Sequence, residues 1–200
     1  MTKAYSPTTP DVSDQKGASL AERAVGAFAG TASPVHSMAR TPAMHIRLAT
    51  EADIPDILTL IHALAVYERE PDAVQIGEAE LRRDGFGAQP LFECLIADDA
   101  GEAAGFALYF PIYSTWRGPS LHLEDLFVQP SHRGRGIGKA LLARVAALAL
   151  ERGCARMQWD VLDWNTPAID VYRGCGAVML EPWRIMRVSG AALARLAGQA

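Results

Sequence analysis

The sequence has few cysteines, and those it has follow no metal-binding or disulfide pattern. Its three cysteines are Cys94, Cys154 and Cys175, which lie far apart and form no CxxC pair. An odd number of such cysteines favours neither a disulfide framework nor a structural zinc site. The histidines are also scattered, so we expect no metal. Thiols outside a disulfide pattern are typical of a reducing compartment, which predicts a cytoplasmic protein.

Long hydrophobic runs and a basic charge excess are absent as well. The longest apolar candidate, residues 140–150, is interrupted by Arg144, whereas a membrane helix needs about 20 apolar residues. Residues 24–32 are too weakly apolar for a secretory signal. The formal net charge is −4, which argues against binding nucleic acid through a broad basic face. We therefore expect no membrane and no nucleic-acid partner.

Residues 1–43 differ in composition from the rest of the chain. They are rich in serine, threonine and proline and poor in aromatic residues. Such a segment buries too little apolar surface to offset the entropy of ordering. We therefore expect a disordered tail over 1–43 and a single domain over 44–200.

Hydrophobic spacing predicts an alternation of strands and helices in that domain. The expected strands are 45–50, 91–97, 105–113, 121–128, 156–162 and 178–188. The expected helices are 53–65, 78–84, 137–152, a helix from 166 to 174 or 176, and 191–196. We expect Gly85 to end the second helix in a left-handed conformation, and Thr166 to cap a helix that begins with Pro167. The order implies an α/β (α+β) domain, with a mixed central β-sheet and helices on both faces.

The most informative segment is rich in glycine and reads Arg133-Gly134-Arg135-Gly136-Ile137-Gly138-Lys139. It follows a predicted strand and opens a helix, so backbone N–H groups converge at the positive end of the helix dipole. A Walker loop is excluded because Arg133 and Ala140 replace its glycine and its Ser/Thr, and Lys139 excludes a Rossmann fingerprint. The segment predicts an anion-binding turn, and the alternative is a glycine-rich connection with incidental arginines.

This segment and its surroundings resemble a known family. The pattern Arg-x-x-Gly-x-Gly, on Arg133, Gly136 and Gly138, resembles the pyrophosphate loop of the GNAT N-acetyltransferases. The segments that extend the resemblance are Tyr67-Glu68, Asp84-Gly85-Phe86-Gly87, the strand 123–128, Asp163-Trp164-Asn165-Thr166-Pro167-Ala168 and Tyr172. Together they resemble the diamine (spermidine/spermine) and thialysine acetyltransferase branch. The resemblance implies acetyl-CoA as the acetyl donor and a homodimer, for which the sequence itself offers only the apolar segment 188–196.

The resemblance also implies roles for individual residues. Those expected to contact acetyl-CoA are Leu126, Phe127, Val128, Arg133, Gly134, Arg135, Gly136, Ile137, Gly138, Lys139, Asn165, Pro167 and Ala168. Those expected on the acceptor side are Tyr67, Glu68, Glu124, Trp159 and Asp160. The expected catalytic residues are Glu124 and Tyr172.

Elementary chemistry supports the two catalytic assignments. A primary amine has a pKa of about 10.4, so it arrives protonated and must lose a proton before it can attack a thioester. Glu124 can accept that proton, and we expect Asp125 to point to the opposite face because strand side chains alternate. Tyr172 can protonate the leaving thiolate. The alternatives are a solvated strand carboxylate for Glu124 and a core tyrosine for Tyr172.

We expect structural roles for the tryptophans and for His122. Trp116, Trp159 and Trp164 are expected to be packing residues or pocket walls. His122 shares a strand face with Glu124, and we expect it to have a structural role.

The favoured function is therefore direct acetyl transfer to the primary amine of a small cationic acceptor, polyamine, diamine or thialysine-like, in a ternary complex. A covalent acetyl-enzyme is disfavoured because no cysteine has an evident activating partner. The alternatives are an amino-acid or protein-amine acetyltransferase on the same fold, and a non-catalytic acetyl-CoA-binding regulatory module. The presence of Glu124 and Tyr172 argues against the module.

Overall fold

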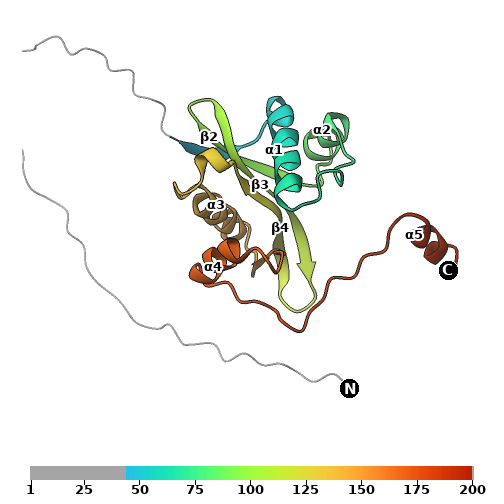
Figure 1. The fold of residues 1–200 in the computed structure, drawn as a ribbon. Helices are drawn as coiled ribbons and strands as arrows, with labels where there is room; N and C mark the ends of the chain where they lie inside the picture. Colours follow the sequence, from blue (N-terminus) through green and yellow to red (C-terminus); the bar gives the residue numbers. More distant parts are fainter. Residues whose placement is uncertain (1–43, 200) are drawn as a thin grey trace, which may run out of the picture. The chain divides into compact units, whose positions relative to one another are not determined.

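The computed structural model describes residues 44–199, so the expected tail over 1–43 lies outside the described residues. Five strands form one mixed sheet in the order β1-β2-β3-β4-β5 (Figure 1). Neighbouring strands are antiparallel from β1 to β4, and β5 is parallel to β4. The strands are β1 (His45–Leu48), β2 (Glu93–Asp99), β3 (Glu102–Ser114), β4 (Gly118–Val128) and β5 (Met157–Gln158). The helices are α1 (Ile54–Tyr67), α2 (Glu78–Phe86), α3 (Ile137–Glu151), α4 (Thr166–Gly174) and α5 (Gly190–Ala197).

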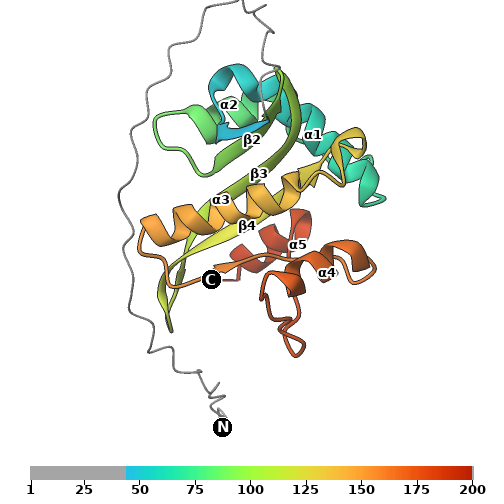
Figure 2. The ribbon, with the colours of Figure 1, turned by 90° about the vertical axis from the view of Figure 1, so that its left-hand side faces the viewer.

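Helices cover both faces of the sheet, as the sequence predicts. One face is covered by α3 (Figure 2). Its Leu141 and Val145 are fully buried against the sheet. On the other face, Ile57 of α1 and Leu81 of α2 pack around Phe106. The apolar side chains of α3 recur every three or four residues, which places them on the one side that the sheet covers. No helix in residues 44–199 is long and apolar enough to cross a membrane.

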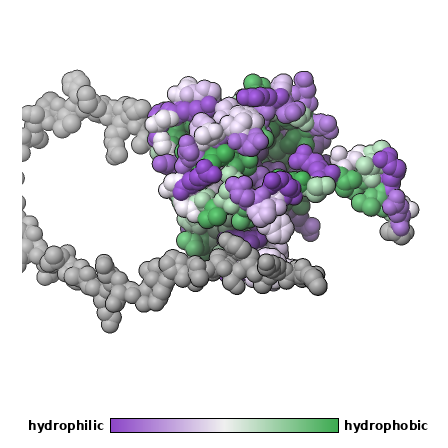
Figure 3. All heavy atoms as spheres, turned by 60° about the horizontal axis from the view of Figure 1, so that its bottom comes forward, coloured by the Kyte–Doolittle hydropathy of each residue, from purple (hydrophilic) through white to green (hydrophobic). Residues whose placement is uncertain are grey.

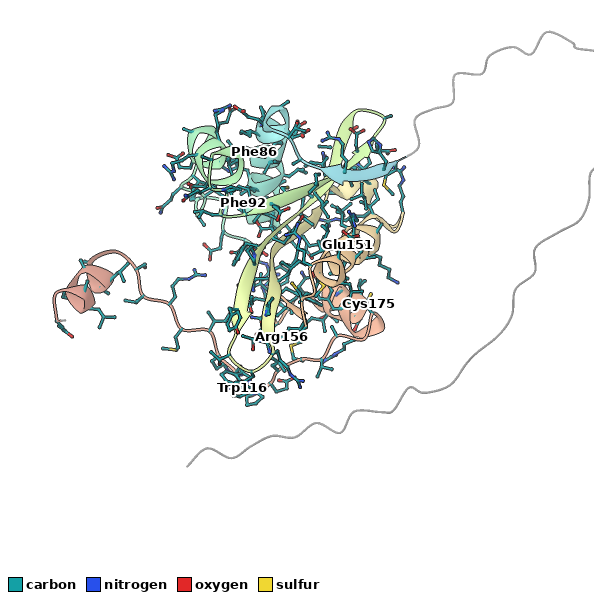
Figure 4. All side chains as sticks on the ribbon, turned by 180° about the vertical axis from the view of Figure 1, so that it is seen from behind. Phe86, Phe92, Trp116, Glu151, Arg156 and Cys175 are labelled. Carbon is teal, nitrogen blue, oxygen red and sulfur yellow. The ribbon has the colours of Figure 1, made fainter. Side chains whose placement is uncertain are left out.

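The second helix runs past the glycine that we expected to end it. α2 continues to Phe86, so Gly85 is helical and the expectation of a left-handed glycine is wrong. A Cβ atom on Gly85 would lie 2.4 Å from Cζ of Phe92, whose ring packs beside this helix (Figure 4). Close approach of an aromatic ring, rather than backbone conformation, is what requires glycine here.

Glycines in a left-handed conformation follow α3 and α4, whereas the residue that caps the start of α4 differs from the expected one. Gly153 and Gly176 adopt positive φ angles of 67° and 88°, and these residues follow the two helices. The N-cap of α4 is Asn165 rather than Thr166, and Pro167 lies in the first turn, where its missing N–H costs no helical hydrogen bond.

The two C-terminal strands differ most from expectation. β5 keeps only Met157–Gln158 of the expected strand 156–162, because it pairs with β4 only at Leu121 and His122. Residues 178–188 form no strand, since none of the described strands pairs with them. A strand requires a hydrogen-bonded neighbour, so apolar composition alone does not make one. The exposed apolar side chains of this region and of α5 are Val178, Met179, Leu180, Trp183, Ile185, Met186, Val188, Leu193 and Leu196.

Candidate functional site

A β-bulge in β4 shapes the centre of the candidate site. In the pairing of β3 with β4, Tyr109 lies opposite Leu123 and Leu108 lies opposite Asp125. Glu124 is therefore the extra residue of the bulge. An extra residue interrupts the alternation of side chains and re-aims those beside it.

The bulge places Glu124 and Asp125 on the same face of the sheet. Leu123 and Leu126 both pack in the α3 core although they are three positions apart, an odd spacing, whereas Phe127 packs in the α1 core. Asp125 shares the α1 side, where its charge raises the pKa of the buried Cys94 thiol further than burial does alone. Our expectation that Asp125 faces away from Glu124 is thus wrong, because the bulge breaks the period of two.

Glu124 reaches solvent on this same face. Its carboxylate oxygen lies 3.3 Å from Nε2 of His122, and its side chain is 54% exposed. The ring centroid of His122 also lies 5.1 Å from that of Phe110. The shared face that we expected for His122 and Glu124 is confirmed.

The charges of two carboxyl groups act on a third at this point of the fold. Burial raises the pKa of Asp125 to about 7, and the charges of Glu124 and Glu68 contribute in the same direction. Burial also raises the pKa of Glu68, the residue that follows α1. A cation that entered here would relieve the repulsion between these groups, so the region favours a positively charged ligand.

The raised pKa of Asp125 has a consequence for stability. The pKa of the Asp125 carboxyl is near 3.8 in the unfolded chain and about 7 in the folded protein. Between pH 3.8 and pH 7 the folded protein therefore keeps a proton on Asp125 that the unfolded chain has lost. Stability is therefore expected to fall as pH rises through this window. Asp125→Asn should reduce that fall, which melting temperatures of parent and variant at pH 5 and pH 8 would measure. Equal pH dependence in both proteins would contradict the assignment.

Tyr172 lies on α4 with its ring against the end of β5. Its ring centroid is 5.1 Å from that of Trp159, in an edge-on arrangement. Burial raises the pKa of its hydroxyl, and the charges of Tyr67 and Glu68 add to the effect. Tyr172 therefore faces the fifth strand as expected and keeps its proton at neutral pH, which a proton donor requires.

Tyr67 connects the end of α1 to the segment after β5. Its hydroxyl donates a hydrogen bond of 2.9 Å to Oδ1 of Asn165, and its ring centroid lies 5.8 Å from that of Trp164. A residue expected on the acceptor side thus contacts one expected on the acetyl-CoA side.

Trp164 is a wall of this region, as expected. Trp116, in contrast, is 81% exposed at the β3–β4 turn, so the packing role expected for it is not found within residues 44–199 (Figure 4).

The glycine-rich loop has the backbone geometry of an anion-binding turn. Gly134 and Gly136 adopt positive φ angles of 77° and 80°, and Gly136 is the N-cap of α3. No atom lies within 4 Å of a Cβ built on either glycine, so the left-handed conformation is what demands them. Ile137 is buried in the α3 core and anchors the loop. The N–H groups of the first turn of α3 are available to an anion.

The two loop arginines contact protein groups. Nη1 of Arg135 lies 2.6 Å from Oδ2 of Asp99, at the turn between β2 and β3. Nε of Arg133 donates a 3.0 Å hydrogen bond to the carbonyl of Val128, and its guanidinium lies 4.9 Å from the ring centroid of Tyr67. A phosphate at the loop would share or replace these contacts.

The remaining expected residues lie on β4, on the segment after β5, on α4 and at the start of α3. Because β5 pairs with β4 only as far as His122, the later part of this β4 edge has no strand partner among residues 44–199. Its backbone groups can therefore pair with an extended ligand. The residues placed along this edge or after β5 are Leu126, Phe127, Val128, Trp159, Asp160, Pro167 and Ala168, while Gly138 and Lys139 lie in the first turn of α3.

Sequence reasoning missed two residues of the site. One is Asp125, whose direction depends on the bulge. The other is Arg69, whose guanidinium carbon lies 4.4 Å from the ring centroid of Trp164. Its position beside Tyr67 and Glu68 was the available signal. Residues 44–199 contain no group of three or more potential metal ligands.

Replacing Arg133 and Arg135 together by alanine is expected to weaken acetyl-CoA binding, with the larger effect at low salt. Charge-assisted contacts to phosphate are strong, and salt screens them when they are exposed. Titration calorimetry at two salt concentrations would measure the loss. Arg117→Ala, which removes an exposed charge at the opposite end of β4, is the matched control. Unchanged affinity of the double variant at low salt would show that the two side chains hold no phosphate.

Comparisons with known proteins identify the family of the chain. The sequence profile of the Acetyltransferase (GNAT) family matches residues 57–177. The chain is 44% identical over 165 residues to the thialysine N-epsilon-acetyltransferase of Sus scrofa, a match that covers 77% of this chain and 97% of that protein. It is 40% identical over 152 residues to the spermidine/spermine N(1)-acetyltransferase-like protein 1 of Homo sapiens, which covers 71% of this chain and 22% of that protein.

Solved structures share the fold. The aminoglycoside N-acetyltransferase AAC(6')-Iy in complex with CoA superposes with a TM-score of 0.60 at 24% sequence identity. The superposition covers 77% of this chain and 99% of the other. At this identity the similarity concerns the fold alone.

Proposed function

The chain belongs to the GNAT acetyltransferase family and is an N-acetyltransferase, and from this premise we propose that it acetylates the primary amine of a small cationic acceptor with acetyl-CoA. The observation that carries the choice of acceptor is the buried carboxyl of Asp125, whose pKa the charges of Glu124 and Glu68 raise further than burial does. The names of its relatives, which refer to thialysine and to spermidine/spermine, agree with this class of acceptor.

Two features support acetyl-CoA as the donor. The loop from Arg133 to Lys139 offers left-handed glycines and the N-terminus of α3 to the pyrophosphate. The unpaired stretch of β4 offers backbone groups to the pantetheine, with Asn165, Pro167 and Ala168 on the facing segment. The thioester supplies an activated acetyl group at the bulge.

The proposed chemistry moves two protons. Glu124 takes the first from the protonated amine, directly or through water, and passes it to solvent. The neutral amine then attacks the acetyl carbonyl, forming the C–N bond while the C–S bond breaks. The second amine proton leaves as the amide forms, and Tyr172 gives its phenolic proton to the thiolate and is reprotonated. The products are an acetylated amine, CoA thiol and one proton.

We propose that the active form is a cytoplasmic homodimer. The support is the exposed apolar side chains of the C-terminal segment, which include Trp183, Ile185 and Met186. Figure 3 shows hydrophobic surface, in green, on the part of the chain that ends it. A second copy of the chain could cover these side chains. Light scattering at micromolar concentration is expected to give twice the chain mass of 21.5 kDa. A value equal to the chain mass would contradict the dimer.

The proposed acceptor class is tested by CoA release with a panel of amines. We expect turnover with diamines, polyamines or diamino acids, and much weaker turnover with a monoamine of equal length, which lacks the second positive charge. Equal kcat/KM for a diamine and the matched monoamine would contradict the role of the carboxyl groups. Turnover restricted to a lysine-containing protein would favour a protein-amine acetyltransferase.

A further inference from the structure

Arg133 contacts residues from both halves of the candidate site. Its Nε donates the 3.0 Å hydrogen bond to the carbonyl of Val128, on the β4 edge proposed for the pantetheine. Its guanidinium carbon lies 4.9 Å from the ring centroid of Tyr67 and 5.5 Å from that of Phe127. The ring quadrupole attracts a cation in such a position. A side chain of the glycine-rich loop is therefore held against Tyr67, which we expect on the acceptor side.

The other arginine of this loop has a different environment. Nη1 of Arg135 lies 2.6 Å from Oδ2 of Asp99, and Nε2 of the buried His132 lies 3.6 Å from the same oxygen. Asp99 thus neutralises the charge of Arg135 at the turn between β2 and β3. Arg133 pairs with no carboxylate of residues 44–199, so its charge is not neutralised in this way.

The charge of Arg133 opposes the binding of a cationic acceptor. Tyr67 is followed by Glu68, whose charge acts on Asp125 at the bulge. These carboxyl groups attract a positively charged acceptor, whereas the guanidinium beside Tyr67 repels it. A phosphate bound to Arg133 would cancel that repulsion, because a guanidinium forms charge-assisted hydrogen bonds with phosphate. The attraction of the carboxyl groups would then act unopposed.

We propose that Arg133 couples the two substrates: the phosphates of CoA neutralise its guanidinium, and the cationic acceptor then binds more tightly. This inference rests on the proposed function and adds to it a dependence of acceptor affinity on the donor. Coupling between two ligands is reciprocal, so the acceptor strengthens CoA binding by the same factor. Since Arg133 is exposed and solvent screens its charge, we expect a factor at the lower end of the usual range, about 5-fold.

Calorimetry can measure this factor without the reaction, with CoA in place of acetyl-CoA. The Kd of CoA is measured at constant ionic strength, first without putrescine and then with putrescine raised until the Kd no longer changes. In the parent protein the Kd should fall about 5-fold. Arg133→Gln should bind CoA more weakly and show no further change on addition of putrescine. Arg133→Lys keeps the charge and should retain part of the factor.

Arg135→Gln is the matched control, because it removes an equal charge from the same loop at a side chain that Asp99 already neutralises. Whatever its own effect on CoA affinity, it should keep the fall in Kd that putrescine causes. A full factor in Arg133→Gln, its loss in Arg135→Gln as well, or no factor in the parent protein would overturn the role of Arg133. Acetylation of putrescine without any coupling would leave the proposed function standing. If the parent enzyme acetylated no small amine, the proposed function would fail, and this inference with it.

Discussion

Replacing Glu124 by glutamine is expected to lower kcat by about 10²–10⁴-fold at pH 7, the usual contribution of a general base. The amide cannot accept the proton that the acceptor amine carries at neutral pH. The defect should shrink as pH rises toward the pKa of the amine, because neutral amine then forms without help. Acetyl-CoA affinity should change little, since the carboxylate lies on the acceptor side. The measurement is kcat against pH, with acetyl-CoA affinity in parallel.

Two further variants show whether Glu124 is the residue responsible. Glu151→Gln removes an exposed carboxylate at the far end of α3 and should leave kcat unchanged (Figure 4). Asp125→Asn removes the neighbouring carboxyl group on the same face. If Glu124→Gln keeps parental turnover at pH 7 while Asp125→Asn loses it, Asp125 accepts the proton and the assignment to Glu124 is wrong.

Replacing Tyr172 by phenylalanine is expected to lower kcat by about 10²-fold or more, because the CoA thiolate then leaves without a proton donor. The pKa of Tyr172 is raised, so the hydroxyl stays protonated at neutral pH. Unlike the Glu124→Gln defect, this one should persist at high pH, since neutral amine does not replace the lost donor.

The leaving group offers a second way to examine Tyr172. An acetyl thioester whose thiol has a lower pKa needs less protonation, so the Tyr172→Phe defect should be smaller with it. Tyr113→Phe, at a side chain 76% exposed on β3, is the matched control. Parental kcat in Tyr172→Phe would show that Tyr172 only packs against Trp159.

The sequence predicted the parts of the site that depend on neighbours in the chain. The conformation of the loop around Gly134 and Gly136 follows from two residues without Cβ atoms before a helix. The helix α3 follows from its own apolar spacing. These features need no information about distant segments, so a single sequence is sufficient for them.

The sequence could not predict features that depend on a distant partner. The bulge at Glu124 exists only relative to Tyr109 and Leu108 on β3, so the period of two along β4 gave the wrong face for Asp125. The hydrogen bond from Tyr67 to Asn165 joins residues 98 positions apart. The segment 178–188 has strand-like composition, but the described strands offer it no pairing.

Direct transfer to a small amine is tested most directly by mass spectrometry of the protein and the small molecules in one reaction. With acetyl-CoA alone, we expect no acetyl group on the protein and no release of CoA. On addition of a cationic diamine or diamino acid, we expect CoA and singly acetylated amine in equal amounts. An acetylated protein that passes its acetyl group on, or CoA release without acetylated amine, would contradict the account.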